Sequence, residues 1–509
     1  MLLPKTLLEP VTTTFFVCKF SFKYYCRFHP HFGEIFKDRI IYHYNTDKNT
    51  NRYKLSSFGG VTLAITLLSS LFAYPVNLAF SLPQQEDGIQ QKKEQITLNA
   101  ILTNLGDPIR WKALIQPALQ ELRERHPNLD IQIAIDANNL YNNTRMKLIN
   151  ALSNQSGRSI DLISVDQIWL GEFAEKGLVT DLSDRVQKWG RSSDWYQSNL
   201  DGMTYNGSIY GVWAWTDVRG IWYWKDLLKE AGINSSSLET WQGYIDSAMK
   251  VNNKIKVREI QGTILFDAAL SPDLWYPYLW MLGGNIIESR DGHPTKGAYW
   301  FPSYNGTEGV RAMEFIKEQA NAGIKPENGD SKNLDEEFAL KKFAIYLGGQ
   351  WIPLWFPQAE QKISNFEEKI GFIPMFPVPN KGNRTITTMM GGWILSIPTV
   401  SENKELAWEL ITIMLEPRIL APWLAKYLYL PTQKPIGEGN YSKLFERTLP
   451  YSQEMLSLIQ FGHGRPTIPE YPSIAEHIRQ AINEVQYGIK EPKQALDDAA
   501  EKSAKILGW

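Results

Sequence analysis

The chain has 509 residues, of which 43% are hydrophobic and 21% are charged, and this balance excludes both a disordered polymer and a multi-pass membrane protein. The net charge of −2 gives no basic field, so no nucleic-acid partner is expected. The only cysteines are Cys18 and Cys26, so the rest of the chain lacks disulfides and cysteine metal ligands. All 18 tryptophans follow residue 110, which suggests a large folded region that binds something flat.

The N-terminal region has the composition of a targeting segment. No charged residue occurs between positions 55 and 85, and the mostly apolar run 58–82 is long enough to span a bilayer. Basic residues precede it, which favours a cytoplasmic N-side. The run is either the core of a cleaved signal peptide, which Pro75 and Asn77 favour slightly, or an uncleaved membrane anchor. Residues 1–54 are then a cytoplasmic tail, or translation starts later.

After a polar linker at 86–95, strand and helix patterns alternate. Alternation of this kind implies right-handed crossovers and a mainly parallel sheet, so the fold class is α/β. The expected strands are 96–102, 131–135 and 160–165, and the expected helices are 111–125, 141–152 and 167–176.

The pattern changes at Tyr205–Ser208, where Asn-Gly between apolar runs predicts a β-hairpin. The next strand, 209–215, breaks the alternation, so we expect the chain to cross here into a second lobe. The first lobe is expected to contain 96–205 and 390–440, and the second 206–389 and 441–509. Further expected elements are helices 224–231, 241–251, 308–321, 402–415 and 478–485, strands 343–347 and 389–397, and a last helix that Pro492 opens.

Motifs of enzyme chemistry are absent from the sequence. It has no dinucleotide-binding or Walker A glycine loop, no metalloprotease or EF-hand motif and no serine-hydrolase elbow. Pairs of carboxylates are uninformative in a chain with 55 acidic residues. The sequence therefore favours a binding protein over an enzyme, with no cofactor and no metal indicated.

Five segments, in order along the chain, resemble the family 1 extracellular solute-binding proteins, the sugar-binding subunits of ABC importers. The resemblance covers essentially 95–509. It implies the two-lobed, type II periplasmic binding protein fold, with a hinge of crossing strands and a ligand cleft between the lobes. The five segments are IDLISVDQIWLGEFAEKGLVTDLS (160–183), IYGVWAWTDVRGIWYWKDLLKEAGI (209–233), IYLGGQWIPL (345–354), MMGGWILSIPTVSENKELAWELITIML (389–415) and 465–507, which opens RPTIPEY.

Four charged residues are candidates for the rim of a sugar site. Asp166 follows strand 160–165, where open α/β sheets bind ligands and where the family places a sugar-binding acid, but it can equally cap the helix that follows. Asp217 matches an acid near the family's hinge, and Asp107 a ligand-contacting acid after the first strand. Arg465 can reach the sugar or a carboxylate.

Aromatic residues are candidates for the flat part of the site, because an aromatic ring buries the apolar face of a pyranose. Trp169 and Trp280 fit either the site or the core. Trp215 matches an aromatic position near the family's hinge, and Gly392 allows close backbone approach. The candidates matching aromatic platforms of the family are Trp351, Trp393 and the adjacent Gly392.

The resemblance implies an exported protein that binds a sugar without altering it and delivers it to ABC permease subunits and their ATPase. We expect a periplasmic or extracytoplasmic monomer. Ala475 replaces the stacking aromatic of the maltose-binding branch, which argues against maltodextrin and leaves trehalose, sucrose, glucosylglycerol-like or other disaccharides. The alternatives are an extracytoplasmic glycan-acting enzyme that uses Asp166 and Asp217, or a sugar sensor anchored by 58–82.

Overall fold

The computed structural model describes residues 93–103, 108–139, 141–153, 159–255, 260–263, 272–289, 300–324, 334–356, 363–380, 382 and 385–509. The chain divides into two compact units, Met1–Gly88 and Ile89–Trp509, and all described residues belong to the second. The apolar run 58–82 lies outside them. Within the described ranges, no helix is both long enough and apolar enough to span a membrane.

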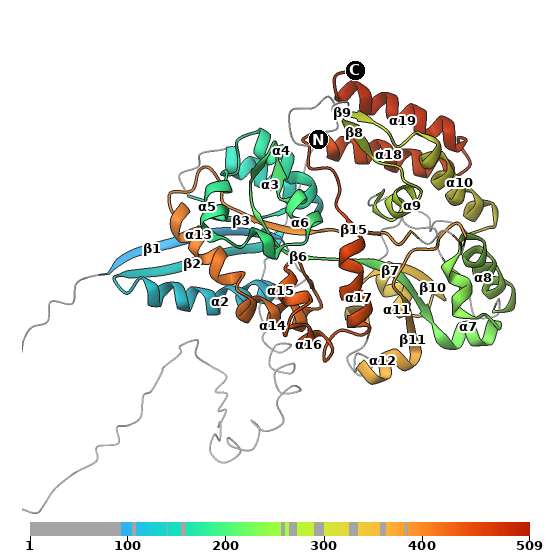
Figure 1. The fold of residues 1–509 in the computed structure, drawn as a ribbon, viewed down its shortest axis with the longest axis horizontal. Coiled ribbons are helices and arrows are strands. Elements are labelled where there is room, and N and C mark those ends of the chain that lie inside the picture. The colour runs from blue at the N-terminus through green and yellow to red at the C-terminus, as the bar shows by residue number, and fades with distance from the viewer. Residues whose placement is uncertain are drawn as a thin grey trace, which may run out of the picture. The chain divides into compact units, whose positions relative to one another are not determined.

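A six-stranded sheet with the order β14-β6-β13-β3-β1-β2 forms the centre of the first lobe (Figure 1). Its first three strands along the chain are parallel, as expected, and β13 runs antiparallel to both β3 and β6. The bounds are β1 Glu94–Thr103, β2 Leu129–Asn139, β3 Leu162–Asp166, β6 Val212–Thr216, β13 Gly392–Ser396 and β14 Leu430–Pro431.

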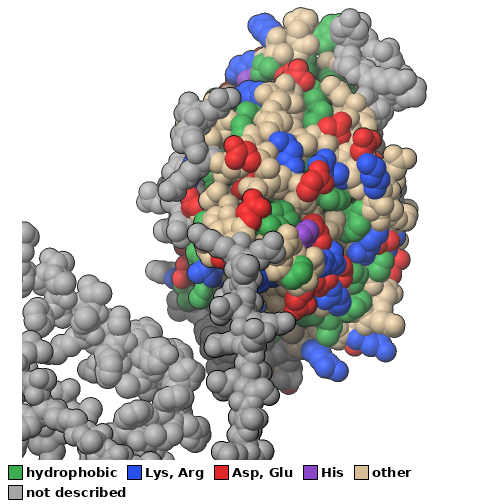
Figure 2. Space-filling model, turned by 90° about the vertical axis from the view of Figure 1, so that its left-hand side faces the viewer, with side chains coloured by type: hydrophobic (Ala, Val, Ile, Leu, Met, Phe, Trp, Pro, Cys, Tyr) green, Lys and Arg blue, Asp and Glu red, His purple; other side chains and the backbone are tan. Residues whose placement is uncertain are grey.

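Helices from two distant parts of the sequence belong to this lobe. The apolar face of α2 is buried, as its spacing predicts, and α13 and α14 pack against it. The helices are α2 Pro108–Arg125, α3 Tyr141–Ser153, α4 Leu170–Glu175, α5 Ser183–Trp189, α6 Gln197–Gly202, α13 Lys404–Met414, α14 Pro417–Tyr427, α15 Lys434–Gly437 and α16 Ser442–Phe445. Figure 2 shows acidic and basic side chains interspersed on the left-hand face of the molecule, as the small net charge predicts.

The second lobe is built on a three-stranded antiparallel sheet with the order β10-β7-β11. Its strands are β7 Arg219–Trp224, β10 Ile345–Gly349 and β11 Ile370–Ile373, and a small sheet pairs β8 Ile287–Ser289 with β9 Trp300–Pro302. Its helices are α7 Lys225–Ala231, α8 Trp241–Lys254, α9 Tyr276–Met281, α10 Thr307–Asn321, α11 Leu334–Ala339, α12 Ile363–Lys369, α18 Tyr471–Gln486 and α19 Pro492–Ile506.

Three extended segments connect the lobes. Strand β6 of the first sheet leads into β7 of the second through only Asp217 and Val218. The chain returns through β12 (Thr388–Met389), which continues into β13. After α17 (Ser452–Leu458), β15 (Gly462–His463) pairs with β12, and the chain then enters α18 (Figure 1).

The position of the first crossing differs from the sequence expectation. The Asn-Gly hairpin is present as β4 (Thr204–Tyr205) and β5 (Ser208–Ile209), but the strand after it, β6, pairs with β13 in the first lobe. The chain therefore crosses at residues 217–218 and not at 206. The reason is that β6 pairs with β13 and β14, which come much later in the chain, and a local hairpin signal cannot reveal such partners.

Local capping residues set the ends of two helices in the second lobe. The Thr240 hydroxyl accepts a hydrogen bond from the Gly243 N–H at 3.2 Å and caps α8. Gly232 ends α7 with φ 67°, a left-handed conformation that costs glycine little. These local rules fix the helix ends, and the burial pattern fixes the faces that pack inward.

Candidate functional site

Five charged side chains meet where the two lobes join. We call this set, Asp166, Asp217, Arg219, Asp273 and Arg465, the interlobe cluster. Asp166 ends β3 of the first lobe, and Asp273 lies in the short 3-10 helix Pro272–Leu274 that precedes α9 of the second. Arg219 is the first residue of β7, and the other two members, Asp217 and Arg465, come from segments that connect the lobes. The cluster thus joins both lobes and the connecting segments in one set of contacts.

Arg465 is the centre of the cluster. Its Nη2 lies 3.3 Å from Asp166 Oδ1, and its Nη1 lies 3.1 Å from Asp273 Oδ2. Asp166 and Arg465 are each only 7% exposed, so these charges are largely removed from water. The same Asp166 oxygen accepts the Ile168 N–H at 3.3 Å, so Asp166 both caps the following turn and pairs with the arginine. The cap that the sequence allowed is therefore present, and the sugar-binding role of Asp166 stays a prediction.

Arg219 and Asp217 form the second half of the cluster. Arg219 Nη1 donates to Asp217 Oδ1 at 2.9 Å, and Arg219 Nη2 lies 3.9 Å from Asp273 Oδ2, which links the two halves. The Gly391 N–H donates to Asp217 Oδ1 at 3.1 Å. A Cβ on Gly391 would lie 2.7 Å from Asp217 Oδ2, so only glycine lets the connecting strand approach this carboxylate so closely.

The composition of the cluster argues for a binding role. Removing charges from water costs several kcal/mol per ion, and apolar residues of the same size often stabilise a protein equally well. Five such groups at one junction are therefore poorly explained by stability alone. Carboxylates accept and guanidinium groups donate charge-assisted hydrogen bonds, so the cluster can satisfy both the donors and the acceptors of a polyhydroxylated ligand.

Trp351 supplies an aromatic surface beside the cluster. The guanidinium carbon of Arg219 lies 5.2 Å from the centre of the indole, and the indole Nε1 donates to Asp335 Oδ2 at 2.7 Å. Tyr346 donates to the other oxygen of Asp335 at 2.9 Å. Burial raises the pKa of Asp335, and the hydrogen bonds from Trp351 and Tyr346 counteract this. Asp335 thus fixes the plane of the half-buried Trp351 ring.

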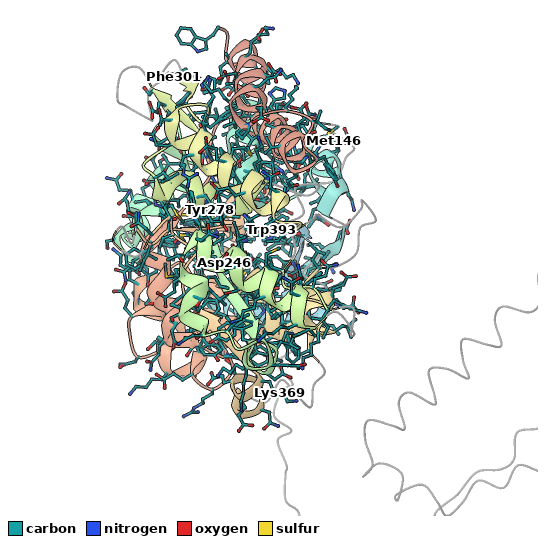
Figure 3. All side chains as sticks on the ribbon, turned by 90° about the vertical axis from the view of Figure 1, so that its right-hand side faces the viewer. Met146, Asp246, Tyr278, Phe301, Lys369 and Trp393 are labelled. Atoms are coloured by element: carbon teal, nitrogen blue, oxygen red, sulfur yellow. The ribbon has the colours of Figure 1, made fainter. Side chains whose placement is uncertain are left out.

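Trp393 and Trp169 border the cluster on the side of the first lobe. Trp393 pairs in register with Asp166, and its half-buried ring meets that of Trp169 edge to face with centroids 5.7 Å apart. Trp169 itself is 4% exposed and belongs to a small core beside β3. Figure 3 places Trp393 at mid-height in the view, between Phe301 near the top and Lys369 near the bottom.

Gly392 has an intramolecular reason for lacking a side chain. It adopts φ 142°, and a Cβ would lie 2.3 Å from both Trp213 Nε1 and the Trp215 carbonyl oxygen. The expected close backbone approach is present, but the partner is the neighbouring strand β6.

Two of the expected aromatic residues pack elsewhere. Trp215 is 3% exposed and meets Trp111, Trp423 and Tyr429 at centroid distances of 5.2, 5.3 and 5.4 Å. The structure therefore places Trp215 in the core of the first lobe. Trp280 is 9% exposed, and its ring packs against those of His463, at 5.0 Å, and Tyr276, at 5.5 Å, so most of its surface contacts other protein groups. Asp107 lies outside the described residues.

A cavity of about 700 Å³ lies between the lobes and is lined by Ser198, Trp280, His463 and Arg465 among others. Arg465 therefore belongs both to the lining of this cavity and to the interlobe cluster. Met390 Sδ is 3.4 Å from the Ser198 hydroxyl, on the cavity side, whereas the next residue, Gly391, faces Asp217. Successive residues of an extended chain point to opposite faces.

Sequence reasoning missed Arg219, Asp273 and Asp335. Arg219 carried a usable signal, because it stands two residues after Asp217 in an extended segment and so shares its face. Asp273 follows no predicted strand, and its position beside Arg465, 192 residues away, is set by tertiary structure alone. Asp335 acts only through Trp351, which no local pattern reveals.

Comparison with known proteins identifies related chains. The family model of the bacterial extracellular solute-binding proteins matches residues 109–419. Among curated proteins, a mannitol-binding protein of Pseudomonas aeruginosa is 22% identical over 443 residues, which cover 81% of this chain and 93% of that protein.

Solved structures share the fold. A solute-binding protein of an ABC transporter from Thermotoga lettingae, bound with α-D-tagatose, has a TM-score of 0.65 at 24% identity and covers 81% of this chain and 100% of its own. A maltose-bound protein of T. maritima has a TM-score of 0.64 at 20% identity, with 81% and 99% covered. The two-lobed α/β fold expected from the sequence is therefore confirmed.

Proposed function

This chain belongs to the bacterial extracellular solute-binding proteins, and from that premise we propose that it is the substrate-binding subunit of an ABC importer and captures a sugar between its lobes. In this proposal the ligand is a di- or oligosaccharide. The relatives named above bind a hexitol, a ketohexose and maltose, which is consistent with a polyhydroxylated ligand here.

The observation that carries the proposal is the interlobe cluster. Its three carboxylates and two guanidinium groups offer acceptors and donors on both lobes at once. Adjacent sugar hydroxyls can satisfy both kinds of group, and charge-assisted bonds are stronger than neutral ones. The half-buried rings of Trp351 and Trp393 can cover the apolar face of a sugar ring, worth about 1–3 kcal/mol by area.

Capture then follows from the geometry of the connecting segments. A sugar that contacts Asp166 on the first lobe and Asp273 on the second makes both sets of contacts only when the lobes are together. It therefore stabilises the closed arrangement by the difference in contacts between the two states. In our proposal the closed form docks on the permease, whose ATPase drives import, and no bond in the sugar is broken by this subunit.

The proposed location is extracytoplasmic, as the family's description indicates. Residues 58–82 have the composition of an export signal or anchor and would take the chain across the membrane. Of the residues expected from the sequence, we propose Asp166, Asp217, Trp351, Trp393 and Arg465 as ligand-binding, and we add Arg219 and Asp273. In this proposal Trp169 supports the Trp393 ring from the core of the first lobe.

A thermal-shift screen tests this function. The panel contains trehalose, sucrose, maltose, glucosylglycerol, D-mannitol and D-tagatose. A sugar at about 100 times its Kd stabilises the folded state by about 2.7 kcal/mol, so binding raises the Tm measurably. The best sugar is then titrated by calorimetry. The absence of any shift and any heat would contradict a sugar-binding function.

Two variants make this experiment specific to the cluster. Asp217→Asn keeps the shape of the side chain but removes its charge, and we expect an affinity about ten- to a hundredfold lower. Asp246→Asn is the matched control, since Asp246 lies exposed on α8 (labelled in Figure 3), and its affinity should equal that of the parent. Product release from nitrophenyl glycosides, abolished by Asp217→Asn, would instead support the enzyme alternative.

A further inference from the structure

The segment that carries Arg465 is attached to the first lobe by one buried amide. Gln167 follows Asp166 directly, and its Nε2 donates to the Arg465 carbonyl oxygen at 2.9 Å and to the Thr467 hydroxyl at 2.8 Å. A few residues on, a Cβ on Gly171 would lie 2.8 Å from the Ile468 carbonyl carbon, so the two backbones are in close contact. Residues 465–468 are therefore held against the turn that also carries Asp166.

The orientation of Gln167 is set by these two bonds. The residue is fully buried, and its Oε1 has no hydrogen-bond partner among the described residues. An unpartnered buried oxygen costs free energy, so nothing on that side of the amide favours its position. The two hydrogen bonds that Gln167 Nε2 donates to residues 465 and 467 are therefore the polar interactions that hold the amide in this orientation.

The guanidinium of Arg465 extends from this fixed backbone to both lobes. Its contact with Asp166 lies within the first lobe, whereas its contact with Asp273 crosses to the second. If the lobes separate while residues 465–468 stay on the first lobe, the contact with Asp166 can persist and the contact with Asp273 breaks. The reach of the guanidinium toward Asp273 depends on where the backbone of Arg465 is held, because the side chain itself has many rotamers.

We propose that Gln167 is a positioning residue that holds the backbone of Arg465 on the first lobe so that its guanidinium bridges Asp166 and Asp273 across the lobe junction. Gln167 itself does not touch the sugar. This inference rests on the proposed function for its biological meaning. The bridge joins side chains of this chain alone, so it can be tested without a sugar.

The test measures the distance between the lobes in the sugar-free full chain. Cys18 and Cys26 are changed to Ser, which removes every native thiol, and spin labels are attached to Lys188→Cys on α5 and Lys229→Cys on α7, both exposed. Gln167→Met keeps the size of the side chain and removes its donors. We expect Gln167→Met to shift the distance distribution to longer values, as Arg465→Met does.

The matched control is Gln433→Met. Gln433 is also fully buried, and its Nε2 donates to the Leu415 carbonyl oxygen at 3.0 Å within the first lobe. A merely structural role for Gln167 would lower the Tm in both variants but leave both distance distributions at that of the parent. A Gln167→Met distribution that coincides with that of Gln433→Met would overturn the proposal.

A milder variant covers the case in which Gln167→Met does not fold. Thr467→Val removes only one of the two acceptors and should give a smaller shift in the same direction, and an unchanged distribution would count against the proposal. In titrations with trehalose, maltose and D-mannitol, Gln167→Met should bind a sugar about tenfold more weakly than the parent, the loss expected for about one hydrogen bond. If the parent binds no sugar, the proposed function fails while the distances still decide the role of Gln167.

Discussion

Two groups of tryptophans in this chain occupy opposite environments. Trp111, Trp215 and Trp423 pack ring against ring inside the first lobe. The indole N–H groups of Trp111 and Trp423 donate hydrogen bonds to backbone carbonyl oxygens of the same lobe. Trp351 and Trp393 are half-buried and stand beside the interlobe cluster. The number of tryptophans in a sequence therefore indicates neither a core nor a binding site. Whether a given tryptophan is a candidate for the site depends on the charged side chains around it.

Trp215→Ala should have the largest effect, and it tests whether Trp215 belongs to the core. We expect the free energy of unfolding to fall by about 3–5 kcal/mol, because a large ring surrounded by three others leaves a cavity. The affinity of the folded fraction for its sugar should stay within about threefold, as expected for a residue that makes no direct contact. Urea unfolding and calorimetry on the same sample measure both. A large loss of affinity with little change in stability would show that Trp215 contributes to the binding site and not mainly to the core.

Trp351→Ala should show the reverse pattern. Losing the ring that covers the sugar should weaken binding by about 1–3 kcal/mol, or roughly five- to 150-fold. The stability loss should be smaller than for Trp215→Ala, because the ring is only half-buried. Trp408→Ala is the control, since Trp408 is equally half-buried but meets Trp189, at 5.7 Å, in the first lobe. Equal affinity losses in the two variants would show that Trp351 acts only through general packing.

The smallest expected effect concerns pH and lies outside the cluster. Burial lowers the pKa of His463, and burial together with Lys502 lowers the pKa of His477. The folded state then binds protons less tightly than the unfolded state, so the stability these residues contribute is complete above about pH 6.5 and is lost as the pH falls through their lowered folded-state pKa values. We expect a lower Tm at pH 5 than at pH 7.5.

Replacing both histidines isolates their share of this loss. In His463→Gln/His477→Gln the decrease in Tm between pH 7.5 and pH 5 should be smaller than in the parent, whereas the sugar affinity at pH 7.5 should be unchanged. An identical decrease in both proteins would mean that other groups cause it.

The sequence predicts the elements of this fold better than their assembly. Helices such as α8 and α19 follow from apolar spacing and from local signals, the N-cap Thr240 of α8 and Pro492 in the first turn of α19. The parallel order of β1 to β3 follows from strand and helix alternation. The lobe in which β6 lies could not be read from the hairpin before it, because sheet membership depends on partners almost 200 residues away.

The candidate site divides in the same way. Asp166 and Asp217 were identifiable, since one ends a buried strand and the other lies in a distinctive block. Arg465 was expected to reach a sugar or a carboxylate, and it reaches two carboxylates. The placement of Trp215 and Trp280 depends on which rings cover them, and that of Asp273 on a contact between distant segments. No spacing in the sequence encodes these facts.

A crystal structure of the chain grown with the sugar that gives the largest thermal shift tests the central claim most directly. We predict sugar density in contact with Asp217, Asp273 and Arg465, with the Trp351 indole against the apolar face of one ring. Density confined to the cavity beside Trp280 and His463, with the interlobe cluster unchanged, would contradict it.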